Sequence, residues 1–392
     1  MTDKTHYFDW AATAPQDADI ARQALELTLE NWGNPSSIHK AGNDAKKILE
    51  EARNRAAKAL CVKPETLFFT SGGTESDHLP LLSLLTRQGK GSFITSAIEH
   101  PALSHMTKMM ENCGWKAITV SPDKNGFIQP DSVASSIQDD TAFIAIMSVN
   151  NETGAIQNVK AIAEAILKKS GSGRKPWFHV DCVQAAGKIE LDLNTPGIDS
   201  ASMSAHKIGG PRGIGLLYLA RQMTSFLRGG GQEKNIRSGT ENVYGASAFS
   251  MCLEKYLIRK ENPSSIERFE QQKQWTSSFI KDILTIPGCT IIPHCREDDN
   301  MADSFSPWIV QASFKGIPGQ VMERALSEKG FYISTGSACS QGRHSRPVLD
   351  SMGISGQEKE DAVRFSFGHD TTKESMDDLV KVLKETIALF VG

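Results

Sequence analysis

The chain has 392 residues, of which 39% are hydrophobic and 23% are charged, and its formal net charge is −3. This composition is typical of a globular protein with one large and one smaller domain, and it excludes a disordered or fibrous chain. The charge balance provides no basic field for nucleic acid, and without a long apolar stretch or a secretory core we expect a cytoplasmic protein with no membrane partner.

Short apolar runs alternate with segments of helical period from about residue 16 to about residue 259. Such an alternation favours a mostly parallel sheet covered by helices, which is an α/β architecture. The runs expected to be strands are 67–69, 93–94, 117–120, 143–146, 177–180 and 215–219.

The last third of the chain has a different pattern. Polar helical segments around 263–285 precede two apolar runs, 308–312 and 363–367, and an amphipathic helix ends the chain. The apolar face of that helix carries Met376, Leu379, Leu383, Ile387 and Phe390. We therefore expect residues 16–259 to form a large domain, and residues 1–15 with 260–392 to form a smaller α+β domain.

Asp181 directly follows the apolar run 177–180, which is predicted to be a buried parallel strand. Ligands of open α/β sheets gather beyond the carboxyl ends of strands, so this carboxylate is expected to face a ligand crevice. Without a further motif, an Asp that opens the next helix on the surface would be the commoner interpretation.

Lys207 provides that further motif. It stands between His206 and a Gly-Pro turn, in an otherwise apolar segment that is not typical of a solvated lysine. Pyridoxal phosphate needs one buried carboxylate, which keeps its ring nitrogen protonated, and one lysine, which holds its aldehyde. Asp181 and Lys207 together therefore predict a pyridoxal phosphate site.

The phosphate of this cofactor needs a cradle of its own. Residues 70–76 follow an expected strand and open a helix, so backbone amides around Gly73 would point at an anion, and Thr74 can add a hydroxyl. Ser204 and His206 flank the lysine segment and can reach the same phosphate. Taken alone, the 70–76 run is more typical of an ordinary helix cap.

The seven cysteines show no CxxC spacing, which favours reduced thiols over disulfides or a metal site. Cys339 differs from the others because it lies in a run of small residues, 334–342, that suits an accessible loop. We therefore interpret Cys339 as a nucleophile and not as a packing residue.

These runs resemble the NifS-like cysteine desulfurases of the class V aminotransferase group. That group has fold type I of the pyridoxal phosphate enzymes, which implies a large domain with a mostly parallel seven-stranded sheet and a smaller α+β domain. The resemblance covers nearly the whole chain, through the runs 7–15, 33–37, 70–76, 99–102, 149–154, 237–242, 334–340 and 364–366 and the segments around 181 and 207.

The resemblance implies that L-cysteine is converted to L-alanine. A persulfide would form on Cys339, and its sulfur would pass to an acceptor protein. Lys207 would hold the cofactor and then move protons, His100 would stack on the cofactor ring and assist, and Gln184 would hydrogen-bond the phenolic oxygen. From its position before Pro101 alone, His100 is an ordinary helix cap.

The resemblance also assigns Thr74, Ser204 and His206 to the phosphate. Thr240 is expected to reach the phosphate from a second subunit, which implies a homodimer, although Thr240 is equally typical of a helix cap.

Asn151 and Arg364 match the residues that hold the substrate carboxylate, and a guanidinium suits this task because it meets a carboxylate with two prongs. The alternatives are that Asn151 is a turn residue and that Arg364 is a surface residue on a strand edge.

Two features depart from the family pattern. His369 stands where the pattern usually has an arginine. Members that dock an iron–sulfur scaffold protein carry a further tail beyond the last helix, so the identity of the acceptor stays open.

Three other functions share parts of this pattern. A selenocysteine lyase would use every cofactor residue and Cys339, a true aminotransferase would leave Cys339 without a role, and a non-catalytic sulfur carrier would not need the pair Asp181 and Lys207.

Overall fold

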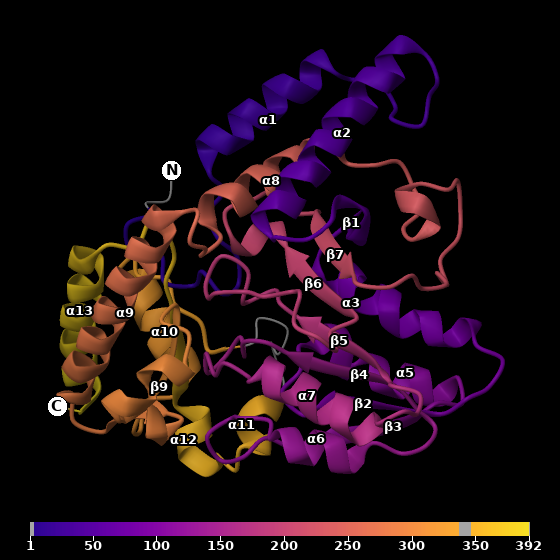
Figure 1. Ribbon diagram of the computed structural model, residues 1–392. Helices are drawn as coiled ribbons and strands as arrows, with labels where there is room; N and C mark the ends of the chain where they lie inside the picture. Colours follow the sequence, from indigo (N-terminus) through magenta and orange to yellow (C-terminus); the bar gives the residue numbers. More distant parts are fainter. Residues whose placement is uncertain (1–3, 337–345, 392) are drawn as a thin grey trace.

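The computed structural model describes residues 4–336 and 346–391, so Cys339 lies outside the described residues. Its strands form a sheet of seven and a sheet of three (Figure 1). The larger sheet contains β1 (Leu67–Thr70), β2 (Ser92–Ser96), β3 (Lys116–Val120), β4 (Thr141–Met147), β5 (Trp177–Asp181), β6 (Ser200–Ser204) and β7 (Gly215–Leu219). The smaller sheet contains β8 (Cys289–Ile292), β9 (Ile309–Phe314) and β10 (Ala362–Ser366).

The helices also form two groups along the chain, an earlier group around the larger sheet and a later group. Those around the larger sheet are α1 (Ala18–Glu30), α2 (Lys40–Ala59), α3 (Gly73–Leu82), α4 (Pro101–Ser104), α5 (Met106–Asn112), α6 (Pro130–Ser136), α7 (Val159–Ser170) and α8 (Val243–Tyr256). The later helices are α9 (Pro263–Leu284), α10 (Gly319–Glu328), α11 (Pro347–Ser351), α12 (Gly356–Glu360) and α13 (Lys373–Val391). Short 3-10 turns are η1 (Pro64–Thr66), η2 (Ser83–Thr86), η3 (Ala205–Lys207), η4 (Glu233–Asn235), η5 (His294–Glu297) and η6 (Asp299–Ser304).

The larger sheet has the order β1-β7-β6-β5-β4-β2-β3. Neighbouring strands from β3 to β6 are parallel, and β7 alone runs antiparallel to its neighbours β6 and β1. The expected α/β fold with a mostly parallel seven-stranded sheet is confirmed.

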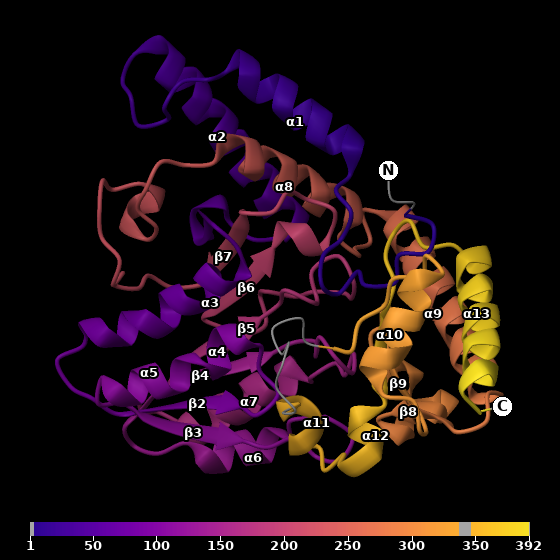
Figure 2. The same ribbon diagram turned by 180° about the vertical axis from the view of Figure 1, so that it is seen from behind.

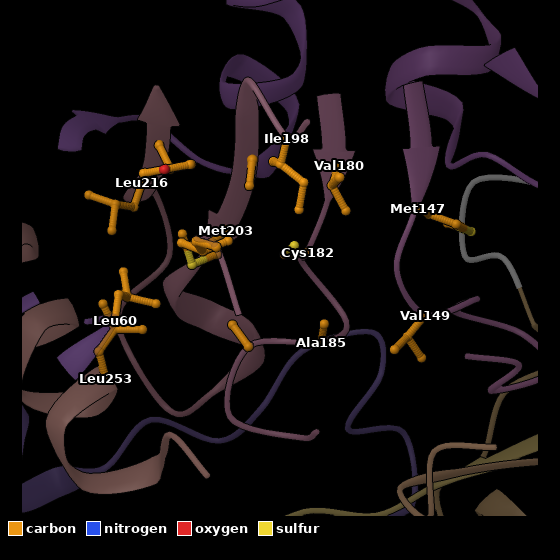
Figure 3. Close-up of a cluster of buried hydrophobic side chains, with 14 of the residues drawn as sticks. Leu60, Met147, Val149, Val180, Cys182, Ala185, Ile198, Met203, Leu216 and Leu253 are labelled. Atoms are coloured by element: carbon orange, nitrogen blue, oxygen red, sulfur yellow. The ribbon is translucent and has the colours of Figure 1, made fainter. Parts of the chain in front are cut away.

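Both faces of this sheet are buried except at the edge strand β3, which explains why most of its strands are continuous apolar runs. Ile94, Ile144 and Leu216 belong to the core on the face covered by α2, α7 and α8, part of which Figure 3 shows. Their neighbours Phe93 and Phe143 point to the opposite face, where α3, α4 and α5 contribute the covering side chains.

Two strands escaped the sequence analysis. In β6 serines alternate with apolar residues, and this pattern is not typical of a buried strand. The serine face is nevertheless buried, because its hydroxyls bond other polar side chains: Ser200 contacts His179, and Ser202 contacts Asp181. The second missed strand, β8, is only four residues long.

The smaller sheet has the order β10-β9-β8, is antiparallel, and packs with α9, α10 and α13 (Figure 2). The N-terminal segment joins this region through backbone bridges between Tyr7 and Tyr332 and between Asp9 and Ser366. The polar segment around 263–285 forms the single helix α9. On α13 the predicted apolar face is buried except at Phe390, which is half exposed.

Among residues 4–336 and 346–391, no helix has the length and apolar character needed to cross a lipid bilayer.

Candidate active site

A cavity of about 290 Å³ opens between the carboxyl ends of the parallel strands and the smaller sheet. Its walls contain most of the residues predicted from the sequence: Gly73, Thr74, His100, Asn151, Asp181, Gln184, Ser204, His206, Lys207 and Arg364. Thr240 is exposed and does not line this cavity. Gly336, three residues before Cys339 in the sequence, does line it.

Asp181 is the last residue of β5 and is buried. Its carboxylate accepts hydrogen bonds from the backbone amide of Val183 at 2.8 Å and from the hydroxyl of Ser202 at 3.4 Å. Burial, and then the nearby carboxyl of Asp77, raises the pKa of Asp181 to about 7. A carboxyl in this state gains from a cationic ring nitrogen placed beside it, because the cation offsets the cost of its burial.

A chain of hydrogen bonds connects Asp77 to the strands behind it. The Trp177 indole donates to Ser200 Oγ at 2.7 Å, and that hydroxyl lies 2.8 Å from His179 Nδ1. His179 Nε2 lies 3.1 Å from the Asp77 carboxyl. Burial lowers the pKa of His179 to about 4, so the ring is neutral and its single proton is assigned to Nε2, which donates to Asp77.

Lys207 ends the 3-10 turn η3 that follows β6. Its Nζ donates to the carbonyl oxygens of Ala11 at 2.7 Å and Ala12 at 2.8 Å. The N-terminal segment, which is bridged to the smaller sheet, therefore helps to position this amine.

The end of the cavity nearest α3 suits a phosphate. Helix α3 begins at Gly73, and its N-cap residue, Gly72, provides no side-chain acceptor for the first amides. Because these amides carry the positive end of the helix dipole, they attract an anion. Thr74, Ser204 and His206 line the cavity beside them.

Two histidines of the cavity are held neutral. Burial, and then the charge of Lys207, lowers the pKa of His100 to about 4 and that of His206 to about 3. His100 Nδ1 accepts the Ala102 amide at 3.1 Å, so His100 is the cap of α4 and also a cavity residue. With Nδ1 accepting, the proton of the neutral ring is assigned to Nε2.

Arg364 lies in the middle of β10 with its side chain buried, so the interpretation as a surface arginine is wrong. Its guanidinium donates to the Asn151 carbonyl at 2.8 Å and to the Asp9 carboxylate at 2.7 Å. Its Nε is buried without a hydrogen-bond partner among the described residues. A substrate carboxylate at this edge would satisfy that donor.

The turn in which Asn151 lies is held by its neighbour. Asn150 Oδ1 accepts hydrogen bonds from the amides of Glu152 and Thr153. Asn150 is therefore the turn residue, and the Asn151 side chain is left to line the cavity.

Gln184 has both ends of its amide engaged. Its Nε2 donates to the Ala11 carbonyl at 2.9 Å, and its Oε1 accepts from Lys188 Nζ at 2.6 Å.

His369 occupies an aromatic contact behind the lysine segment. Its ring stacks on Tyr256 with centroids 4.3 Å apart and meets Trp10 edge to face at 4.9 Å. Burial is the main cause that lowers the pKa of His369. A neutral, flat ring fits between two aromatic side chains. His369, which departs from the family pattern, therefore has a packing role.

Three charged residues of this region escaped the sequence analysis: Asp9, Asp77 and Lys188. Asp9 stands in the largely apolar run 7–12, whereas Asp77 and Lys188 each have an acidic residue two positions away, Glu75 and Glu190, so no local pattern marked those two.

A larger cavity, of about 650 Å³, lies among residues 127–130, 156–160 and 189–198. Its walls are mostly apolar and contain none of the predicted site residues, so the smaller cavity is the better candidate for chemistry.

Comparison with known proteins gives a consistent result. The family described as aminotransferase class-V matches residues 6–379. A protein of Methanosarcina thermophila named cysteine desulfurase IscS is 34% identical over 391 residues, which cover 98% of this chain and 92% of that protein. A solved structure titled NifS-like protein has a TM-score of 0.85 at 31% identity and covers 98% of this chain and 99% of its own. Another, titled SspA in complex with cysteine, has a TM-score of 0.78 at 26% identity, with coverage of 94% and 100%.

Proposed function

The chain belongs to the class-V aminotransferase family, and from this membership and the cavity we propose that it is a cysteine desulfurase that converts L-cysteine to L-alanine. The observation that carries the proposal is the convergence of Asp181, Lys207 and Arg364 on one cavity. Relatives named cysteine desulfurase IscS, about one third identical over nearly the full length, support the same reaction.

We propose pyridoxal 5'-phosphate as the cofactor, since the donor set fits it. Asp181 would keep the ring nitrogen protonated, Lys207 would hold the aldehyde, and the amides of α3 with Thr74, Ser204 and His206 would bind the phosphate. When bound, the cofactor acts as a sink for the electrons released at the substrate.

The residues of this chain prepare the substrate in defined ways. Arg364 and Asn151 would hold its carboxylate, and the unpaired Nε of Arg364 supports this role. Lys207, once the substrate has displaced it, would move a proton between substrate atoms. His100 would lie against the cofactor ring and, with the proton of its neutral ring on Nε2, would donate a proton there.

Cys339 would carry the sulfur. Its thiolate attacks the sulfur of the bound cysteine, so a sulfur–sulfur bond forms while the bond from sulfur to Cβ breaks. The electron pair of the broken bond stays with the substrate, which takes up a proton at Cβ and leaves as alanine. The position of Gly336 at the cavity wall supports this assignment.

We also propose that residues 16–259 form the large domain and that residues 1–15 with 260–392 form the small one. The bridges from Tyr7 and Asp9 to the region of the smaller sheet support this division. The cavity would then lie between the domains, with Lys207 on the large one and Arg364 on the small one.

A homodimer completes the proposal. In this arrangement Thr240, which does not line the cavity of its own chain, would reach the phosphate site of a second copy. The persulfide sulfur would pass in the cytoplasm to an acceptor protein, for example one that assembles iron–sulfur clusters.

The test is mass spectrometry of the protein after incubation with L-cysteine. One extra sulfur atom on the peptide that contains Cys339, and alanine formed in step with it, are expected. Cys339→Ala should yield neither, whereas Cys182→Ala, a change at a buried cysteine, should behave as wild type. Sulfur located elsewhere, or transamination that survives Cys339→Ala without sulfide, would overturn the proposal, and a strong preference for selenocysteine would redirect it to a lyase.

A further inference from the structure

Lys188 is a buried lysine that the mechanism above does not use. It is 5% exposed, and its backbone carbonyl accepts the Trp308 indole at 2.7 Å. It makes no ion pair with a carboxylate among the described residues, and the charges that act on it are those of Lys207 and Arg364, both positive. An amine in such a place is costly, so the contact it makes needs an explanation.

That contact is with Gln184. Lys188 Nζ donates to Gln184 Oε1 at 2.6 Å, and Gln184 Nε2 donates to the Ala11 carbonyl at 2.9 Å. A backbone carbonyl only accepts, so the amide atom beside Ala11 must be the nitrogen, and the amide oxygen then faces the Lys188 amine, which donates to it. One N–H of Nε2 is used by Ala11, and the second remains for the cavity that Gln184 lines.

We propose that Lys188 is a positioning residue that fixes the Gln184 amide so that its remaining N–H donates to the phenolic oxygen of pyridoxal phosphate. This inference rests on the proposed function, since it needs the cofactor. If the amide turned over, its oxygen would face both the Ala11 carbonyl and the phenolic oxygen, and the Lys188 amine would lose the acceptor to which it donates, so two oxygen–oxygen contacts would replace favourable ones. A donor on Oε1 also polarises the amide and strengthens the N–H that it presents.

The same contacts connect this residue to the lysine that holds the cofactor. The Ala11 carbonyl accepts from both Gln184 Nε2 and Lys207 Nζ, at 2.9 and 2.7 Å. A continuous set of hydrogen bonds therefore runs from Lys188, behind the cavity wall, through Gln184 and Ala11 to Lys207.

The test follows the visible absorption band of the purified holoenzyme and the pH at which that band titrates. A donor to the phenolic oxygen favours its deprotonated form, so Lys188→Met should move the midpoint upward by about 0.5 to 1 pH unit. Lys175→Met is the matched control, because Lys175 is paired with Asp199 away from the cavity, and its midpoint should equal that of wild type.

Removing a buried positive charge could move the midpoint through space, and a double-variant cycle separates the two causes. In a Gln184→Leu background, Lys188→Met should produce no further shift if it acts through the amide. A full shift in that background would overturn the inference. Gln184→Glu, which keeps a partner for Lys188 and removes the N–H, should raise the midpoint in the same direction even if Lys188→Met does not fold.

The outcomes distinguish this inference from the proposed function. If wild type purified with added pyridoxal phosphate has no visible band, the cofactor assignment itself fails. If wild type has the band and folded Lys188→Met titrates at the same pH, only the role of Lys188 is contradicted.

Discussion

Asp77 and Asp181 are two buried carboxyl groups beside one cavity, and burial is the main cause that raises the pKa of each from 3.8 to about 7. The folded protein without cofactor therefore binds these protons more tightly than the unfolded chain does. The contribution of these two groups to the free energy of unfolding is fully present below pH 4 and is lost as the pH rises from about 4 to about 7. Above pH 7 it no longer changes.

Asp77→Asn should reduce this loss. The amide keeps an acceptor for His179 Nε2 and removes both one titrating group and its charge from Asp181. Without cofactor, the free energy of unfolding of the variant should therefore rise relative to that of wild type as the pH increases from 4 to 7. The rise is up to about 1.4 kcal/mol per pH unit for each proton that folded wild type binds and the variant does not. Urea unfolding at several pH values measures the difference. A stability difference that does not change with pH would contradict the assignment of the raised pKa to Asp77.

Arg364→Lys should weaken substrate binding and leave the cofactor in place. A lysine retains the positive charge but cannot present the planar fork that contacts Asn151 and Asp9 and leaves Nε for a carboxylate. We expect KM for L-cysteine to rise about 10- to 100-fold, in steady-state assays of alanine, with the visible band unchanged. Arg22→Lys, a change at an exposed ion pair, is the control. A loss confined to kcat would argue against a carboxylate ligand.

Residues that carry a local pattern could be predicted from the sequence, and residues defined by a distant contact could not. Asp181 ends an apolar run and Lys207 precedes a glycine turn, so both stand out locally. Asp9 meets Arg364 across 355 positions, and Asp77 meets His179 across 102. Only the fold brings these pairs together, so a single sequence gives no sign of them.

At the scale of elements, the connection from residue 221 to residue 242 depends on one buried ion pair. Its turn η4 has three consecutive residues in the left-handed region, Glu233, Lys234 and Asn235, with φ of 46°, 54° and 66°. Arg53 of α2 holds Glu233 with two hydrogen bonds of 2.8 Å, and the Phe69 amide donates to the same carboxylate at 2.9 Å. These contacts offset the cost of the strained backbone.

Glu233→Gln should therefore destabilise the protein by about 3 kcal/mol or more, because it leaves the buried Arg53 charge without its main partner. Glu50→Gln removes the other, half-exposed carboxylate of Arg53 and should cost less than about 1 kcal/mol. Chemical unfolding of both variants gives the comparison, and limited proteolysis should cut Glu233→Gln between 221 and 242. Equal costs for the two variants would contradict this account of the turn.

Elements with strong periodicity were predicted, and those shaped by polar contacts were not. The apolar strands β4, β5 and β7 are evident in the sequence because both faces of the sheet are buried. Strand β6 is not evident, since its serines look solvated but serve His179 and Asp181. Its polarity is a consequence of the site beside it.

The whole molecule assembles the cavity from three parts of the chain: the N-terminal segment at Ala11 and Ala12, the larger sheet, and Arg364 in the smaller sheet. The sequence patterns predicted Asp181 and Lys207, and the family resemblance added Arg364, but neither placed Ala11 and Ala12 at the cavity. Thr240 is exposed outside the cavity of its own chain, and in the proposed dimer the second copy would supply it as a fourth part.

Two segments at one end of the molecule expose large apolar side chains that could contact a second subunit. Trp32 and Ile38, in the connection from α1 to α2, are 77% and 95% exposed, and Phe226 and Leu227 are about half exposed. Both segments project from the end opposite the smaller sheet (Figures 1 and 2). Large exposed apolar side chains are typical of a subunit interface, and the segment with Phe226 and Leu227 also leads to Thr240.

If the protein forms the proposed dimer through this surface, the double variant Trp32→Glu/Ile38→Glu should shift it from dimer to monomer, because the dimer would have to bury both new charges. Sedimentation velocity measures the shift, and fluorescence titration with pyridoxal phosphate should show weaker binding as the partner's hydroxyl is lost from the phosphate site. Leu389→Glu, at an exposed leucine of α13, is the control and should leave both properties unchanged. A variant that stays dimeric would place the interface elsewhere, whereas a monomer that binds the cofactor as tightly as wild type would remove Thr240 from the phosphate site.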